Sequence, residues 1–182
     1  KIYLTFDDGP HPEITPWILE QLKKYDAKAT FFCLGKNAEK YPEIVNQIVA
    51  DGHHIGNHSF SHHNWIDVWG TRKVTEDFDA CKKLIEQYQP QSKLFRPPYG
   101  VTNPNIAKAL KQLNLESIDW YVRSYDTSIK DVEKIKQRVI SQLKPGAIIL
   151  LHDRLDFMPE VLETLIPAIK ENGFGFVSEF KV

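Results

Sequence analysis

Short apolar runs alternate with longer amphipathic stretches along the chain. Most of the short runs have the length and the content of branched and aromatic residues that are typical of strands. The predicted strands are Ile2–Phe6, Ala29–Leu34, His54–Asn57, Leu94–Phe95, Ser117–Val122, Ala147–Leu151 and Phe174–Phe180. Between the strands, apolar residues recur at helical spacing, most clearly over Thr71–Tyr88.

Prolines and glycines predict where the helices begin and end. Proline fits the first helical turn, and glycine fits the residue after the last turn. Thr15 is expected to cap the first helix before Pro16, and Gly173 to end the last helix, which Pro167 should bend. The expected helices begin at or next to Pro16, Pro42, Thr71, Pro104, Asp131 and Pro159.

Strands and helices that alternate in this way favour a parallel sheet with right-handed crossover connections. The 182 residues suit one domain, so we expect residues 1–182 to form a single α/β unit. A parallel sheet that is closed or partly closed into a barrel fits the pattern best, and an open doubly wound sheet is the alternative.

The composition excludes several classes of protein. The formal net charge is −1, so the chain lacks the basic surface of a dedicated nucleic-acid binder. The longest apolar run, Ala147–Leu151, is too short to span a membrane. Only Cys33 and Cys81 are present, which excludes a cysteine-based zinc finger, and we expect two buried free thiols. No glycine-rich phosphate loop follows a predicted strand, so a nucleotide site has no support.

Five polar clusters follow predicted strands, where parallel α/β folds place their active sites. In the first, Asp7 and Asp8 are interpreted as one metal ligand and one base, and a solvated Asp-Gly turn is the alternative. In the second, His58 and His62 can share one cation if their segment makes a helical turn. The alternative there is a chance cluster of surface histidines.

The other three clusters add an arginine, an aromatic residue and a candidate acid–base group. The RPPYG motif that begins at Arg96 could clamp a carboxylate or be a stiff structural loop. Trp120 and Asp126, six residues apart, form the fourth cluster. The alternative is that Trp120 is only a residue of the hydrophobic core. His152 follows the most apolar strand and could be an acid–base catalyst or a structural histidine. Together, the five clusters are the inventory of a metal-dependent hydrolase with a carboxylate base and an imidazole acid.

The sequence resembles the polysaccharide deacetylases, which are the NodB-type domains of carbohydrate esterase family four. The resemblance rests on TFDDGP from Thr5, HSFSH from His58, RPPYG from Arg96 and LLHD from Leu150, in this order. It implies a distorted parallel (β/α) barrel of seven to eight strands with one bound divalent metal ion. It also implies an N-deacetylase whose partner is an acetylated glycan containing N-acetylglucosamine, of the chitooligosaccharide or peptidoglycan type.

The resemblance gives each matching residue a role around the metal. Asp7 would be the general base, and Arg96 would orient it. The metal ligands would be Asp8, His58 and His62. Zinc is the expected ion, and cobalt, nickel and iron are alternatives because mixed histidine and carboxylate sites accept several metals.

The remaining implied roles concern the oxyanion, the leaving group and the substrate pocket. The backbone N–H of Tyr99 would help to form the oxyanion hole. His152 would be the general acid, and Asp126 would tune it. The substrate and its acetyl methyl group would be contacted by Trp120, Leu150 and Pro98.

Three positions depart from the usual pattern of the family. His54 replaces a common Glu, Arg123 replaces a frequent acidic residue, and Thr127 replaces a usual Trp. The last two border the groove and leave the substrate preference open. The alternative functions are an O-acetyl esterase acting on acetylated xylan, a catalytically silent carbohydrate-binding domain and a purely structural metal site. The family implies an extracellular, periplasmic or cell-surface location, and the sequence leaves the oligomeric state open.

Overall fold

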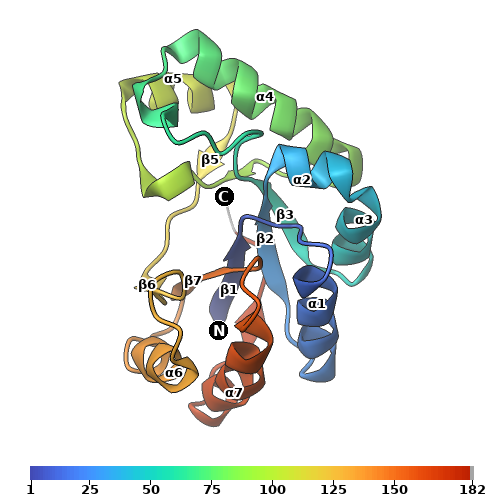
Figure 1. Ribbon diagram of the computed structural model, residues 1–182, viewed down its shortest axis with the longest axis vertical. Coiled ribbons are helices and arrows are strands. Elements are labelled where there is room, and N and C mark those ends of the chain that lie inside the picture. The colour runs from blue at the N-terminus through green and yellow to red at the C-terminus, as the bar shows by residue number, and fades with distance from the viewer. Residues whose placement is uncertain (181–182) are drawn as a thin grey trace.

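One curled sheet of parallel strands forms the centre of the molecule (Figure 1). The structure is a computed structural model, and it describes residues 1–180. The strands within this range are β1 (Ile2–Asp7), β2 (Ala29–Cys33), β3 (His54–Asn57), β4 (Leu94–Phe95), β5 (Glu116–Ser117), β6 (Val122–Arg123), β7 (Ile148–His152) and β8 (Phe176–Val177). Their order is β5-β4-β3-β2-β1-β7-β6, and β8 pairs with β1. Because β5 and β6 do not pair within the described range, the barrel is open on that side, as the sequence pattern for a partly closed barrel predicts.

Helices surround the sheet on its outer side (Figure 1). They are α1 (Ile14–Lys24), α2 (Gly35–Lys40), α3 (Pro42–Ala50), α4 (Thr71–Tyr88), α5 (Pro104–Leu113), α6 (Val132–Ile140) and α7 (Met158–Glu171). Two short 3-10 helices, η1 (Ile66–Val68) and η2 (Pro98–Gly100), lie in loops. Neighbouring helices also pack on one another, as α1 and α6 do on α7, and α5 does on α4.

The register of the central strands brings several strand ends to one edge of the sheet. Asp7, the last residue of β1, is opposite His152, the last residue of β7. On the other side of β1, the register runs through β2 to Asn57 at the end of β3 and then to Phe95 at the end of β4. The residues that directly follow these ends, and therefore meet at the same edge, are Asp8, His58 and Arg96.

The interior is apolar, as the patterns of the strands and helices predict. All residues of β2 are buried, and Phe6 of β1 stacks on Phe31 of β2 with ring centroids 5.0 Å apart. Cys33 and Cys81 are both buried and free, which confirms the expectation of two buried thiols. The Sγ of Cys81 donates a weak hydrogen bond to the carbonyl of Cys33 at 3.5 Å.

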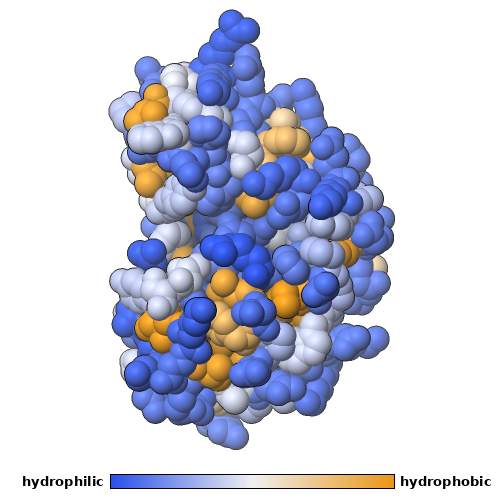
Figure 2. Space-filling model, viewed as in Figure 1, coloured by the Kyte–Doolittle hydropathy of each residue, from blue (hydrophilic) through white to orange (hydrophobic). Residues whose placement is uncertain are grey.

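The outer surface is polar. In the view of Figure 2, hydrophilic residues cover most of the molecule, and apolar residues form small separate patches. Among residues 1–180, no helix has both the length and the apolar character needed to cross a membrane.

One predicted strand is interrupted. The sequence predicts a single strand over Ser117–Val122, but the structure has the short strands β5 and β6 with an irregular segment between them. The guanidinium group of Arg96 accounts for the interruption, because its Nε donates to the carbonyl of Ile118 at 3.0 Å and its Nη2 donates to the carbonyl of Asp119 at 3.4 Å. These carbonyls bind a side chain instead of a neighbouring strand.

One expectation about a helix is corrected, and one helix was not predicted. Thr15 does not cap α1, which already begins at Ile14. The Thr15 hydroxyl instead accepts a hydrogen bond from the N–H of His11 at 2.7 Å and donates one to Oδ2 of Asp153 at 2.8 Å. The helix α2 was not predicted because, apart from its initial glycine, Ala38 is its only buried residue, so it has no apolar stripe.

Candidate active site

A polar pocket lies at the edge of the sheet where the strand ends meet. Most of the site residues that the sequence predicts line it, whereas Arg96 and Asp126 are buried and contact lining residues. Pro98 is buried and does not line the pocket, whereas its neighbour Pro97 does. The lining residues are Asp7, Asp8, His58, His62, Pro97, Tyr99, Gly100, Trp120, Arg123, Thr127, Leu150, His152 and Arg154.

Asp8, His58 and His62 bring three potential ligand atoms within 4.8 Å of one another. The Oδ1 atom of Asp8 lies 3.5 Å from the Nε2 atom of each histidine. The Nδ1 atom of His58 is 2.8 Å from the carbonyl oxygen of Arg96, so Nδ1 carries the proton and Nε2 is left free to bind a cation. One carboxylate and two imidazoles are a ligand set that suits zinc and similar divalent ions. The three side chains therefore fit a divalent metal ion.

Side-chain hydrogen bonds bring His58 and His62 to the same side of the pocket, without the helical turn on which the sequence analysis made their pairing depend. The segment between them is not helical. Oδ1 of Asn57 accepts from the N–H of Ser59 at 2.8 Å, and Oγ of Ser59 accepts from the N–H of His62 at 3.0 Å. Asp77 of α4 accepts two further hydrogen bonds from backbone N–H groups of this loop, at 2.9 and 3.2 Å. The loop is thus held in place by two side chains that the sequence analysis did not identify, Asn57 and Asp77.

Asp7 is buried and paired with Arg96. The Nη1 atom of Arg96 donates to Oδ1 of Asp7 at 2.8 Å and to Oγ1 of Thr5 at 2.7 Å. Arg96 is fully buried, and its guanidinium carbon lies 4.1 Å from the centroid of the Phe32 ring. The other carboxylate oxygen of Asp7, Oδ2, lies 3.8 Å from Nε2 of His58. Arg96 therefore fixes one oxygen of Asp7 while the other faces the metal-ligand group.

His152 forms a second pair with Asp126. Oδ1 of Asp126 lies 2.8 Å from Nδ1 of His152, and Oδ2 accepts the backbone N–H of His152, also at 2.8 Å. Burial of His152 opposes its charged form, but the hydrogen bond and the negative charge of Asp126 outweigh burial, so the pKa of His152 is raised above its usual value. The pair holds a protonatable imidazole in the pocket.

One charged residue of the pocket lining, Arg154, was not identified from the sequence. The Nε atom of Arg154 donates to Oδ2 of Asp8 at 2.6 Å. Burial by itself would raise the pKa of Asp8, but the hydrogen bond and charge of His58, and then Arg154, hold it well below the usual range. Asp153 is fully buried, which raises its pKa to about 7. Asp153 is the last residue of the LLHD motif, whereas the only sequence signal for Arg154 is its place two residues after His152.

Aromatic and apolar residues form the other side of the pocket. Trp120 is half-buried and lines the pocket, so the alternative of a core tryptophan is wrong. A Cβ atom on Gly100 would lie only 2.4 Å from the Trp120 ring, so the indole packs directly on this glycine. Tyr99 has a left-handed backbone with φ 60°, and its ring meets the ring of His62 edge-on at 4.6 Å. Leu150 completes the apolar part of the lining.

Known proteins are similar to this chain in sequence and in fold. The family model described as polysaccharide deacetylase matches residues 1–118. A chitooligosaccharide deacetylase from Azorhizobium caulinodans is 38% identical over 155 residues, which are 84% of this chain and 73% of that protein. A peptidoglycan-N-acetylglucosamine deacetylase from Bacillus cereus is 37% identical over an alignment of 190 positions, gaps included, which covers 98% of this chain and 66% of that protein.

A solved structure agrees with these matches. The structure of peptidoglycan deacetylase PdaC from Bacillus subtilis resembles this one with a TM-score of 0.88 at 32% identity, covering 97% of this chain and 86% of that chain. The segment that the family model matches contains Asp7, Asp8, His58, His62 and the RPPYG motif. The chain belongs to the polysaccharide deacetylase family.

Proposed function

We propose that the chain is a metal-dependent carbohydrate N-deacetylase that removes acetyl groups from glycans containing N-acetylglucosamine, of the chitooligosaccharide or peptidoglycan type. The observation that carries the proposal is one pocket that holds Asp7, His152 and the group Asp8, His58 and His62. A carboxylate base and an imidazole acid beside a metal-ligand set are the groups that hydrolysis of an amide requires. The names of the two relatives support the class of substrate.

Asp8, His58 and His62 would hold the metal ion, and zinc is the ion that we propose. Three protein ligands favour a catalytic site, because structural zinc sites usually have four. When bound, a divalent ion polarises the acetamide carbonyl and acidifies a water molecule. Cobalt, nickel or iron would also suit this ligand set.

The other residues of the pocket would move the protons. Asp7 would accept a proton from the attacking water through Oδ2, the oxygen that Arg96 does not bind. As the water oxygen bonds to the acetyl carbon, the N–H of Tyr99 would donate to the oxyanion, an interaction worth about 3 kcal/mol. His152 would protonate the nitrogen as the C–N bond breaks, which releases acetate and a free amino sugar.

Asp126 would keep the general acid protonated, and the apolar residues of the pocket would position the acetyl group. The Asp126 carboxylate holds Nδ1 of His152 and raises the pKa of the imidazole, which keeps the acid protonated at higher pH. Trp120 and Leu150 lie in the lining and would contact the acetyl methyl group. Their apolar surfaces would exclude water from that side of the substrate.

The test is acetate release from chitin oligosaccharides, peptidoglycan fragments and acetylated xylan, each with and without a chelator. Release from an amino-sugar substrate that the chelator abolishes supports the proposal. Asp7→Asn is the matched variant, and it should retain metal while losing about 10²–10⁴-fold in turnover. Release from xylan alone would identify an O-acetyl esterase, and no release from a metal-loaded protein would indicate a silent binding domain.

We also propose that the protein acts outside the cytoplasm, in an extracellular, periplasmic or cell-surface location. The proposal is supported by the family, because polymers of the peptidoglycan and chitin type lie outside the cell membrane. Fractionation of the source cells, with the protein detected by antibody, would test it, and recovery only in the cytoplasmic fraction would contradict it.

A further inference from the structure

Arg123 is the one cation of the pocket lining that has no acidic partner among residues 1–180. The acidic residues of the lining are Asp7 and Asp8. Each already faces an arginine, since Arg96 binds Asp7 and Arg154 binds Asp8. Arg123 is exposed, and none of the ion pairs of the described residues includes it. Its positive charge is therefore available to a ligand.

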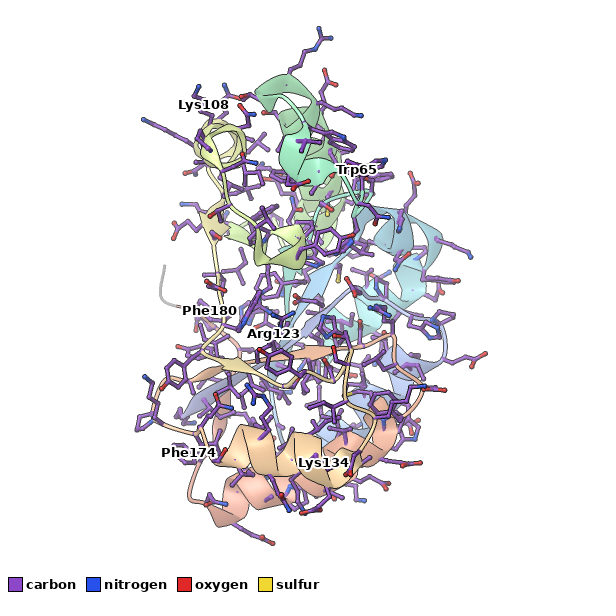
Figure 3. All side chains as sticks on the ribbon, turned by 60° about the vertical axis from the view of Figure 1, so that its left-hand side comes forward. Trp65, Lys108, Arg123, Lys134, Phe174 and Phe180 are labelled. Atoms are coloured by element: carbon purple, nitrogen blue, oxygen red, sulfur yellow. The ribbon has the colours of Figure 1, made fainter. Side chains whose placement is uncertain are left out.

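The fold directs Arg123 toward the place where substrate would lie. Arg123 ends β6 and is opposite Leu150 of β7 in the register. Residues paired in this way project from the same face of a sheet, and Leu150 lines the pocket. Figure 3 shows Arg123 in the middle of the molecule, between the helices at its two ends.

Aromatic rings hold the Arg123 side chain in position. Its guanidinium carbon lies 4.8 Å from the centroid of the Tyr125 ring and 6.0 Å from that of the Trp120 ring. The guanidinium of Arg138 lies over the same Tyr125 ring at 4.3 Å, and its Nε donates to the carbonyl of Arg123 at 2.9 Å. Two guanidinium groups at one ring make the electrostatic potential beside Arg123 more positive. Because the stacking already restricts the Arg123 side chain, ligand binding would cost it less conformational entropy.

We propose that Arg123 selects glycans that carry a carboxylate on the sugar next to the one that loses its N-acetyl group. The inference rests on the proposed deacetylase function and adds a specificity residue to it. A planar guanidinium with free N–H groups matches a carboxylate, and a neutral chitin oligosaccharide offers no such group. The matching polymer has alternating amino sugars in which every second one carries a lactyl carboxylate, as in peptide-free peptidoglycan.

Two tetrasaccharides of alternating N-acetylglucosamine and N-acetylmuramic acid test the inference. One keeps its lactyl carboxylates, and the other has them converted to neutral methylamides. Binding to the zinc-loaded chain is followed by tryptophan fluorescence, and acetate release is measured in parallel. The wild type should bind the carboxylate form about fivefold more tightly, the upper end of what a single exposed ion pair contributes, and salt should reduce the difference.

Three variants give the controls. Arg123→Gln should remove the discrimination, and Arg123→Lys should keep most of it because it keeps the charge. Arg72→Gln removes an exposed arginine of α4 that pairs with Glu76 and does not line the pocket, and it should discriminate like the wild type. Equal binding of both tetrasaccharides by the wild type, or unchanged discrimination in Arg123→Gln, would overturn the inference.

The two readouts separate this inference from the proposed function. Discrimination in binding without acetate release from any substrate would contradict the deacetylase function and leave the role of Arg123 standing. Chelator-sensitive acetate release without discrimination between the two tetrasaccharides would support the deacetylase function and contradict the role of Arg123.

Discussion

Arg96→Met tests whether a buried ion pair both stabilises the fold and holds the proposed base. The guanidinium of Arg96 is fully buried, and it binds Oδ1 of Asp7 at 2.8 Å. It also donates to the hydroxyl of Thr5 and to the carbonyls of Ile118 and Asp119. Methionine keeps much of the length and the contact with apolar neighbours but removes every one of these donors.

The structure sets the size of the effect. Because the Asp7 side chain is only 4% exposed, the loss of Arg96 leaves a buried charge without a partner, which costs about 3–5 kcal/mol. Each carbonyl that loses its hydrogen bond from Arg96 and that water cannot reach adds about 1–3 kcal/mol to the loss of stability. A domain of ordinary stability has about 5–15 kcal/mol in total. Arg96→Met should therefore fold marginally, and Arg96→Lys should lose less because it keeps a charge near Asp7.

A double-mutant cycle makes the reasoning specific to the pair. Asp7→Asn alone should destabilise the protein, because it leaves Arg96 buried without its counter-charge. In the Arg96→Met background the same change should raise the free energy of unfolding, by about 1–3 kcal/mol, because it removes the unpaired carboxylate.

Urea unfolding followed by circular dichroism, with a chelator present to remove any contribution from metal binding, measures all four proteins. A loss below about 1 kcal/mol in Arg96→Met would refute the assigned burial cost. Equal effects of Asp7→Asn in both backgrounds, within about 0.5 kcal/mol, would show that the two side chains do not act as a pair.

Three further predictions follow from the site. His58→Ala should weaken zinc binding by more than about 100-fold, because even the residues that only support metal ligands contribute about 10–100-fold to metal affinity. Unchanged metal content in this variant would show that His58 is not a ligand. Asp126→Asn should lower the pKa of His152, so the alkaline limb of the pH profile should move to lower pH; an unmoved limb would contradict their coupling. Gly100→Ala should displace Trp120, which its Cβ would meet at 2.4 Å, and should raise KM and change the indole fluorescence; wild-type values for both would contradict the contact.

Periodic elements could be predicted from the sequence because burial of one face leaves a regular signature. The helix α4 has the bounds that its apolar stripe predicts, Thr71–Tyr88. The polar clusters could be placed together for a similar reason, since the ends of parallel strands meet at one edge of the sheet. This rule predicted that the Asp7–Asp8 and His58–His62 clusters meet, and the family resemblance singled out Asp8, His58 and His62 as the ligand group. The structure brings the ligand atoms of these three residues within 4.8 Å of one another.

Contacts between distant segments could not be predicted in this way. The break between β5 and β6 depends on Arg96, more than twenty residues earlier in the chain, whose side chain binds the Ile118 carbonyl. The loop that carries His58 and His62 depends on Asp77 of α4. Arg154 contacts Asp8 across almost the whole length of the chain. Such bonds leave no periodic trace, because each needs only one polar residue at one position.

The backbone at Asp8 explains how two neighbouring aspartates can serve one pocket. In a regular strand, Asp7 and Asp8 would project from opposite faces of the sheet. The strand β1 ends at Asp7, and Asp8 has a left-handed backbone with φ 79°, a conformation that costs a residue other than glycine about 1–3 kcal/mol. The amide of Asn37 donates to the carbonyl of Asp8 at 2.8 Å, and Arg154 binds its carboxylate, so contacts from two distant segments offset this strain. The turn lets both carboxylates enter the pocket with different partners, which the proposed roles of Asp7 as base and Asp8 as metal ligand require.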